Sequence, residues 1–261
     1  MPQLSFVIVE YHGLDDVRNA INSIRRHVTG LDYDIIVASN SEYDQARLSE
    51  ICQSFEDIRF ASTGANEGYA AGVNYGVAHS EGDYVFLFNP DAELVSGGFD
   101  QLVDYMEDNP SVAILGPRVT DDADVVQPSC RRFPKWYTFL LVRSFLRRFF
   151  FSRREQARYL MEDFERSSTR QVDWVSGGAL LIRRSAAESI GGMDDRYFLY
   201  MEDVDWCKRA RDAGWQVVYN PSVTIKHAGQ HSSIQGGFLK QTQIWHLKSL
   251  MKYFFKHGFF S

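Results

Sequence analysis

Three short runs of the sequence place residues that bind metals or move protons next to the expected ends of helices and strands. The first run is Asn89-Pro90-Asp91, which follows the apolar run 84–88. A carboxylate at the end of a buried strand can hold Mg²⁺ or Mn²⁺ against a diphosphate, because these ions prefer oxygen ligands and leave room for phosphate oxygens. The same residues could instead form a turn in which the Asn and Asp side chains bond their own backbone.

The second run is acidic: Glu202, Asp203 and Asp205 open an expected helix over 202–213. Acids in a first helical turn are stabilised by the helix dipole, which is explanation enough for a lone cluster. The same dipole keeps a carboxylate ionised, which suits a general base that accepts a proton from a substrate hydroxyl. The approach to this helix, Gly191-Gly192 followed by aromatic residues, is typical of a loop around a substrate.

The third run is Lys226-His227-Ala228-Gly229, whose single histidine could be structural or a metal ligand. Glycines also recur at a spacing of four, at positions 64, 68, 72 and 76. Such a ladder allows the close approach of either a neighbouring strand or a nucleotide. It is not the GxGxxG fingerprint of dinucleotide-binding proteins.

Alternating strands and helices are expected to position these residues. Apolar runs predict strands at 4–9, 34–38, 58–61 and 84–88, and helical periodicity predicts helices at 15–27, 45–55 and 69–79. This order is typical of an α/β fold, in which helices cover both faces of a parallel sheet. Ligands of such sheets bind at the carboxyl ends of the strands. The chemistry is therefore expected at Glu10-Tyr11-His12, Ser39-Asn40-Ser41 and Asn89-Pro90-Asp91.

The pattern is less regular after Pro110. We expect strands at 113–116, 172–175, 179–183, 216–219 and 223–226, one or two helices over 133–164, and a final helix from about 238 to 256. No linker rich in Pro, Gly or Ser and no internal repeat divides the chain, so the sequence predicts a single domain over 1–261.

Composition narrows the class of protein. The 261 residues are 44% hydrophobic and 24% charged, as in ordinary globular proteins. The cysteines, Cys52, Cys130 and Cys207, form no CxxC motif, which argues against disulfides or a zinc site and fits the cytoplasm. The first residues lack the basic and small-residue features of a signal peptide. No stretch reaches the ~18 apolar residues that a membrane span needs.

Charge is unevenly distributed. The segment 131–158 has nine Lys or Arg and one acid, so its net charge is +8 and the remaining chain carries −14. A local basic stretch on an acidic body favours an anionic partner and argues against nucleic-acid binding. Aromatic residues, among them Trp136 and Phe149, alternate with the arginines. Such helices suit the headgroup region of an anionic membrane. The final helix adds Lys248, Lys252 and Lys256.

The alternative is that both helices pack on the core or on a second subunit, as in a homodimer.

Taken together and in order, the motifs resemble glycosyltransferase family 2. The resemblance rests on Asn66-Glu67-Gly68-Tyr69-Ala70-Ala71-Gly72-Val73-Asn74-Tyr75-Gly76, Gly82-Asp83-Tyr84 and Asn89-Pro90-Asp91-Ala92-Glu93-Leu94. Further runs are similar to its rhamnosyltransferase-like branch: Val172-Asp173-Trp174-Val175-Ser176-Gly177-Gly178, Gly191-Gly192-Met193-Asp194, Tyr200-Met201-Glu202-Asp203-Val204-Asp205-Trp206-Cys207, and His227 with Ser232-Ser233. The resemblance covers nearly the whole chain.

The resemblance implies a GT-A fold: a Rossmann-like nucleotide-sugar-binding half with a mostly parallel sheet at 1–116, an acceptor-binding and catalytic half at 117–236, and an amphipathic helix at 237–261. It implies inversion at the anomeric carbon, Asp203 as catalytic base with Glu202 beside it, and a divalent metal held by Asp91 and His227. The implied nucleotide-sugar-binding residues are Glu10, Tyr11, Asn40, Gly68, Gly72, Asn74, Asn89, Asp91, Trp174, Gly177 and Gly178.

The sequence departs from the family at three positions. Asn89 replaces the first acid of the Asp-x-Asp motif, so the metal has one charged ligand fewer. Ser39 stands where the family has an Asp that contacts the nucleoside, and Glu10-Tyr11-His12 replaces Thr-Tyr-Asn after the first strand.

The expected function is transfer of a sugar, with rhamnose from dTDP-rhamnose as first choice, from a nucleotide diphosphate to a saccharide or polyprenyl-diphosphate-linked acceptor at the inner face of the cell membrane. A UDP-hexose or UDP-galactofuranose donor is an alternative. A relative that binds a saccharide or a partner without turnover is another, favoured by Ser39 and Glu10. A nucleotidylyltransferase is disfavoured, because no Gly-rich triphosphate loop with Lys or Arg follows the first strand.

Overall fold

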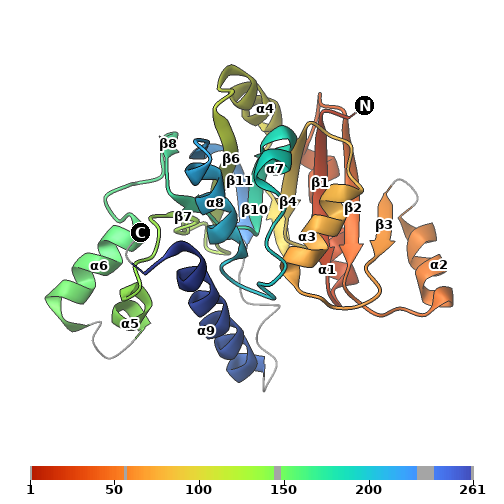
Figure 1. Ribbon diagram of the computed structural model, residues 1–261. Coiled ribbons are helices and arrows are strands. Elements are labelled where there is room, and N and C mark those ends of the chain that lie inside the picture. The colour runs from red at the N-terminus through yellow and green to blue at the C-terminus, as the bar shows by residue number, and fades with distance from the viewer. Residues whose placement is uncertain (1, 56–57, 144–147, 228–237, 260–261) are drawn as a thin grey trace.

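The computed structural model describes residues 2–55, 58–143, 148–227 and 238–259. Its centre is a mixed nine-stranded sheet in the order β3-β2-β1-β4-β10-β6-β11-β5, with β8 also paired to β11 (Figure 1). Ala228, Gly229, Ser232 and Ser233, which the motif analysis uses, lie outside the described residues.

The first half of the chain forms the parallel part of the sheet. It comprises β1 (Leu4–Glu10), α1 (Leu14–His27), β2 (Tyr33–Ser39), α2 (Gln45–Ser54), β3 (Arg59–Ser62), α3 (Tyr69–Ala78) and β4 (Tyr84–Phe88). β1 pairs in parallel with β2 and β4, and β2 in parallel with β3. The predicted parallel α/β half is therefore confirmed, and its strand ends lie at one edge.

The second half extends the same sheet with mixed strand directions. It comprises β5 (Ala92–Leu94), α4 (Phe99–Asp108), β6 (Val112–Thr120), β10 (Ala179–Arg183), α7 (Arg184–Ile190), α8 (Glu202–Asp212) and β11 (Gln216–His227). β10 runs antiparallel to β4 and β6, while β11 runs parallel to β6. The proposed division at 116 and 117 falls inside β6, so the two halves share one sheet.

Two sequence predictions in this half are wrong. The strands expected at 216–219 and 223–226 are one strand, β11, whose register on β6 shifts between Tyr219 and Thr224. The shift absorbs the polar Asn220-Pro221-Ser222 run that looked like a turn. The strand expected at 172–175 is only β9 (Trp174–Val175), because its partner β7 (Cys130–Arg131) is equally short.

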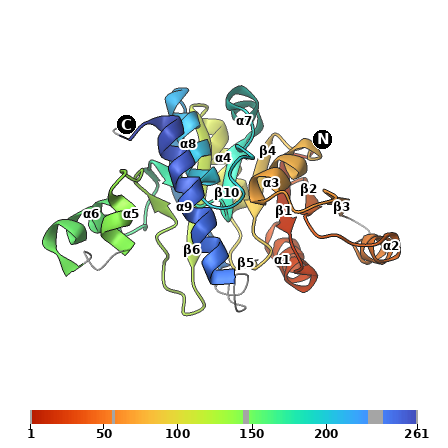
Figure 2. The same cartoon turned by 60° about the horizontal axis from the view of Figure 1, so that its bottom comes forward.

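Two helices, α5 (Thr138–Arg143) and α6 (Phe150–Leu160), take up part of the expected helical segment 133–164. α9 (Phe238–His257) is the expected final helix, and β8 (Arg170–Gln171) is a short edge strand. The second view shows α9 crossing in front of the sheet, between the α5–α6 pair and α3 (Figure 2). Phe139 in α5 contacts His246 in α9, with ring centroids 5.1 Å apart.

The core has two layers because alternate residues of each buried strand face opposite sides of the sheet. Phe6 and Ile8 of β1 pack with α1 and α4, whereas Val7 and Val9 pack with α3 and α8. α3 lies so close to β1 that a Cβ added at Gly76 would meet Val7 Cγ1 at 2.4 Å. The glycine ladder therefore serves helix–strand packing at this position. No helix in the described part of the chain is long and apolar enough to cross a membrane.

Candidate active site

The expected site has two ends, named after the roles that the resemblance implies: the metal end, at Asp91 and His227, and the base end, at Asp203. The metal end lies where β4 and β11 finish. Buried β4 delivers Asn89 and Asp91, and β11 ends at His227, which pairs with Ala92 of β5. His227 Nε2 lies 3.0 Å from Asp91 Oδ1 and 3.5 Å from Asn89 Nδ2. The structure thus brings together Asp91 and His227, which lie 136 positions apart in the sequence. A carboxylate and an imidazole in contact can act as two ligands of one divalent cation.

The base end of the site lies at the first turn of α8. Asp203 Oδ2 accepts a hydrogen bond from the Gly177 N–H at 2.9 Å, and Oδ1 accepts one from the Val204 N–H at 2.8 Å. The residue before the helix, Met201, and its neighbour Tyr200 both have positive φ, a strained conformation for side chains of this size. The turn into α8 thus stores strain directly beside the carboxylates.

A glycine turn joins the two ends. The Asn89 N–H donates to the Gly178 carbonyl at 2.9 Å, and the Tyr69 hydroxyl donates to the Gly177 carbonyl at 2.8 Å. A Cβ at Gly178 would meet Asn89 Nδ2 at 2.8 Å, and one at Gly177 would meet Asp203 Cβ at 3.1 Å. The absence of side chains at Gly177 and Gly178 thus lets Asn89 and Asp203 pack against the same turn.

Burial perturbs both carboxylates of the pair. Burial raises the pKa of Asp203, although the N–H groups of Gly177 and Val204 and the charge of Arg131 pull the other way. Burial, together with the Asp203 charge, raises the pKa of Glu202 well above its usual range. Glu202 Oε2 is buried with no hydrogen-bond partner among the described residues. Such a pair of neighbouring carboxylates with raised pKa values is typical of a proton-transfer site.

The nucleoside end differs from the family pattern and has its own polar cluster. Glu10 is fully buried and accepts hydrogen bonds from the hydroxyls of Ser39, Ser41 (3.1 Å) and Tyr43 (2.9 Å) and from the Gly13 N–H (2.9 Å). Neutral donors alone therefore satisfy this carboxylate. Its neighbour Tyr11 is exposed, and its ring lies 4.4 Å from that of His12.

Four further residues expected to bind the nucleotide sugar have structural contacts. Asn40 Nδ2 donates to the Gly68 carbonyl at 3.0 Å, and Asn40 also packs against Gly72. Asn74 exchanges two hydrogen bonds with the Met193 backbone, at 2.7 and 2.8 Å. These contacts brace the loops around the site, and nucleotide contact by these residues stays a prediction.

Beside the metal end lies a polar cavity of about 390 Å³, whose lining includes Ser129, Arg131, Ser176, Gly178 and His227. Arg131 was not among the predicted site residues. The β7–β9 pairing places it opposite Trp174, and its guanidinium carbon lies 5.1 Å from the Trp174 ring centroid. No sequence signal separates it from the other arginines of the basic segment, because the contact forms only in the tertiary structure.

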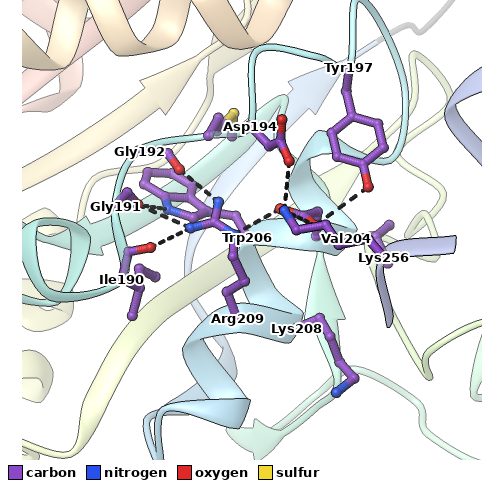
Figure 3. Close-up of polar contacts among 12 residues, drawn as sticks. Ile190, Gly191, Gly192, Asp194, Tyr197, Val204, Trp206, Lys208, Arg209 and Lys256 are labelled. Atoms are coloured by element: carbon purple, nitrogen blue, oxygen red, sulfur yellow. Dashed lines mark hydrogen bonds and ion pairs between the residues drawn. The ribbon is translucent and has the colours of Figure 1, made fainter. Parts of the chain in front are cut away.

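A buried ionic cluster holds α8 in place from the side opposite to Asp203. Asp205 is fully buried and accepts from Arg209 Nε at 2.8 Å, Lys256 Nζ at 3.0 Å and His257 Nε2 at 2.7 Å. Figure 3 shows Arg209 reaching the carbonyls of residues 190–192, while Lys256 also binds Asp194. The cluster ties α9, α8 and the glycine loop into one unit.

A parallel α/β half, a carboxylate–imidazole pair at its edge and a half-buried carboxylate across a glycine turn are the arrangement of a glycosyltransferase of the GT-A type. Residues 5–191 match the model of the family described as "Glycosyl transferase family 2". The chain belongs to this family, so it is an inverting glycosyltransferase, as the motifs predicted.

Relatives of known name come from the same branch. The chain is 34% identical, over 213 residues, to the N-acetylglucosaminyl-diphospho-decaprenol L-rhamnosyltransferase of Mycobacterium tuberculosis, covering 76% of this chain and 67% of the relative. It is 27% identical over 258 residues to the rhamnosyltransferase WbbL of Escherichia coli K12, covering 95% and 91%.

Solved structures show the same fold. GalNAc-T7 with UDP, GalNAc and Mn²⁺ superposes with a TM-score of 0.69 at 13% identity, over 97% of this chain and 48% of that one. The mannosyltransferase PcManGT of Pyrobaculum calidifontis, with GDP-Man and Mn²⁺, gives 0.61 at 14% identity, over 98% and 64%. At these identities the likeness establishes the fold alone.

The Asp205 cluster makes a prediction about stability and pH. Burial raises the pKa of Asp205, but hydrogen bonds from His257, Lys256 and Arg209 outweigh it and the pKa lies below its ordinary value. This carboxylate therefore stabilises the fold above the unfolded-state pKa of about 4, and the stabilisation is lost as pH falls through the folded-state pKa. Asp205→Asn should cost about 3–5 kcal/mol in urea unfolding at pH 7, because it leaves Arg209 and His257 without their carboxylate partner, while Lys256 keeps Asp194.

The loss should shrink as the pH is lowered below 4. The control is Asp212→Asn, the same change in the same helix. Asp212 pairs with Lys208 and is 55% exposed, so it should cost at most about 1 kcal/mol. Equal costs for the two variants, or a cost independent of pH, would contradict this account.

Proposed function

We propose that this glycosyltransferase moves rhamnose from dTDP-rhamnose to a saccharide carried on a polyprenyl diphosphate, with a divalent metal at Asp91 and His227 and with Asp203 as base. The observation that carries the proposal is the pairing of the Asp91–His227 contact with Asp203 across the Gly177-Gly178 turn. The named rhamnosyltransferase relatives support the sugar and the acceptor. A donor screen with UDP-hexoses and UDP-galactofuranose tests the alternatives.

The residues at the metal end fit Mg²⁺ or Mn²⁺. In the described part of the chain no group of three or more His, Cys, Asp or Glu side chains could hold a metal alone. Asp91 and His227 offer two ligands, which leaves positions for the oxygens of a donor diphosphate. When bound, the cation would stabilise the charge that the leaving nucleotide diphosphate gains.

Asp203 acts on the acceptor. Its carboxylate takes the proton from the acceptor hydroxyl as that oxygen bonds to the anomeric carbon, and the bond from this carbon to the phosphate oxygen breaks. The nucleotide diphosphate leaves with the electron pair. The raised pKa of Asp203 makes it a stronger base than an exposed aspartate, which favours this transfer. Direct displacement inverts the anomeric carbon and needs no covalent enzyme intermediate.

A non-catalytic role is disfavoured by the same geometry. Ser39 and Glu10 suggested lost nucleotide binding, but Ser39 donates its hydroxyl to the Glu10 carboxylate on the neighbouring strand. A carboxylate is thus retained at this edge of the sheet, supplied by β1 instead of β2.

We also propose that the enzyme lies on the inner face of the cell membrane through the α5–α6 surface, defined by Trp136, Leu140, Arg148, Phe149, Phe150, Phe151, Arg153 and Arg154. Its five apolar side chains are 42–79% exposed, and its three arginines are exposed as well. Aromatic and cationic side chains together suit an anionic headgroup layer. Two further arginines of segment 131–158 are left out of this surface, because Arg147 and the side chain of Arg143 lie outside the described residues.

The contribution of α9 is smaller than its lysine spacing suggested. Lys252 donates to the Arg196 carbonyl and Lys256 binds two carboxylates, so two of the three lysines at the spacing of four have partners within the chain. Its exposed apolar residues, among them Leu247 and Phe255, remain available beside the α5–α6 surface.

Removing the metal-binding carboxylate should weaken donor binding. In calorimetry with dTDP, Asp91→Ala should lower the metal-dependent affinity by about 100-fold, because loss of even an outer partner of a metal site costs 10–100-fold. The control is Asp124→Ala, which removes a carboxylate that is 82% exposed and should leave the metal-dependent affinity for dTDP unchanged. Unaltered affinity and metal dependence in Asp91→Ala would refute the assignment.

Removing the base should stop transfer without affecting the donor. Asp203→Asn should slow turnover by ~10²–10⁴ and leave the affinity for dTDP unchanged. A buried group with a raised pKa is destabilising once ionised, so this variant should melt at the same temperature or higher at pH 7. A variant that keeps more than half of the turnover would assign the base to Glu202 or another group.

Membrane binding can be tested by co-sedimentation with vesicles. The wild type should pellet with anionic but not neutral liposomes at low salt, and less so at 1 M salt, where the Debye length is ~3 Å. Changing Arg148, Arg153 and Arg154 to Glu should keep it in the supernatant. The same charge change at Arg18, Arg26 and Arg47 is the control. Failure of the wild type to pellet would make this surface a subunit contact.

A further inference from the structure

The polar cavity beside the metal end contains a cation that the mechanism above does not use. Arg131 is fixed from three sides: its Nε donates to the Pro128 carbonyl at 2.8 Å, and its guanidinium carbon lies 5.6 Å and 5.1 Å from the ring centroids of Tyr159 and Trp174. Stacking on two rings holds the planar guanidinium in one orientation, which lowers the entropy cost of binding an anion.

The charge of Arg131 is not neutralised by any carboxylate in the described part of the chain. No described carboxylate lies within ion-pair distance of it, in contrast to its neighbour Arg132, which pairs with Asp173 at 3.4 Å. The cavity also contains Asp121, but that carboxylate accepts from the N–H groups of Ala123 and Val125, at 3.0 Å each, and from the amide of Gln127. An arginine held without a counter-ion in a polar cavity is suited to an anionic ligand.

A second group in the cavity lacks a partner. The hydroxyl oxygen of Ser129 is buried without any hydrogen bond among the described residues, although Ser129 lines the cavity. A buried hydroxyl without a partner is costly, and a ligand with several acceptor oxygens would satisfy it. A phosphate group offers such oxygens to both the hydroxyl and the guanidinium, and arginine binds it through two parallel hydrogen bonds.

From this we infer that Arg131 and Ser129 bind the diphosphate of the acceptor, as distinct from that of the donor; the inference rests on the proposed function. The donor diphosphate belongs to the Asp91–His227 end. Arg131 instead belongs to β7, in the half of the chain (117–236) that the resemblance assigns to the acceptor, and it lies close enough to Asp203 for its charge to act on that carboxylate. An acceptor whose hydroxyl reaches Asp203 would place its own diphosphate along this wall.

Arg131 is connected through aromatic contacts to the α5–α6 surface, which is the proposed membrane-binding surface. Tyr159, on which Arg131 stacks, belongs to α6 and contacts Phe139 of α5, with ring centroids 5.7 Å apart. Both helices expose the apolar residues of the α5–α6 surface. A polyprenyl chain leaving the diphosphate at Arg131 would therefore meet apolar side chains and the membrane, without crossing the polar cavity.

Binding of a prenyl diphosphate tests this without requiring turnover. Geranyl diphosphate is titrated calorimetrically into protein already saturated with dTDP and Mn²⁺, so that the donor site is filled. Arg131→Met should weaken its affinity about 10- to 100-fold, as expected for a lost hydrogen bond to a charged group. Arg132→Met removes the same charge one residue along and should change the affinity less than about twofold.

The dTDP titration in the absence of prenyl diphosphate separates the two sites. Arg131→Met should bind dTDP with wild-type affinity and keep its Mn²⁺ dependence, which Asp91→Ala should not. If Arg131→Met weakens dTDP binding instead, the guanidinium serves the donor and the inference is wrong. Equal affinity of wild type and Arg131→Met for geranyl diphosphate would overturn it as well, while leaving the proposed transfer reaction intact.

A kinetic comparison provides the second arm. With an acceptor saccharide on an alkyl diphosphate, Arg131→Met should lose kcat/KM about 10- to 100-fold, mainly through KM. With the matching alkyl glycoside, which has no phosphate, wild type and variant should react at the same rate. Equal losses on both acceptors would show that Arg131 positions Asp203 and does not recognise the acceptor diphosphate.

Discussion

The hydrogen bond from the Gly177 N–H to the Asp203 carboxylate sets the distance across the active site. The same turn accepts the Asn89 N–H at Gly178, so one pair of glycines is bonded to the base at one side and to the metal-binding strand end at the other. A side chain at Gly178 would collide with Asn89, and one at Gly177 would press on Asp203. The groups proposed to face the donor and the acceptor are thereby connected through the backbone of this turn.

This arrangement has a cost in stability. Glu202 is buried beside Asp203, one of its oxygens has no partner, and both pKa values are raised. Backbone strain at Tyr200 and Met201 adds to this cost in stability. Contacts around the site offset the cost: Ser249 donates to the Leu199 carbonyl at 2.9 Å, and Lys256 of α9 binds Asp205 in the ionic cluster. A destabilised site held by a stabilised frame is a common relation between activity and stability.

Much of the fold could be predicted from sequence because the first half follows simple rules. Apolar runs of strand length separated by amphipathic helices gave the parallel sheet, and ligand binding at strand ends pointed to Asp91. The resemblance supplied the roles of Asp203 and His227, whose proximity to Gly177 and Asp91 the structure shows.

The second half of the sheet and the position of Arg131 depend on pairing between distant segments, which leaves no local pattern in the sequence. β10 enters the sheet between β4 and β6, although residues 121–178 separate it in the chain from β6 and residues 89–178 separate it from β4. Its antiparallel direction therefore leaves no trace in its own sequence. The short β7–β9 pair cannot be predicted from the sequence of either strand alone. This pairing places Arg131 opposite Trp174 and so distinguishes it from the eight other basic residues of segment 131–158. Likewise, nothing in the spacing of the α9 lysines reveals that two of them bind inside the chain.

The first turn of α8 shows how environment divides the work between two aspartates two positions apart. Asp205 points to Arg209, Lys256 and His257, which hold its pKa down, so it stays charged and anchors the helix. Asp203 points the other way, where only backbone N–H groups and the more distant Arg131 oppose its burial, so its pKa is raised. The same side chain in the same helical turn is thus an ionic anchor in one direction and has, in the other, the raised pKa that suits the proposed base. Because both aspartates belong to the first turn of α8, the contacts of Asp205 with the C-terminal helix also help to fix the position of Asp203.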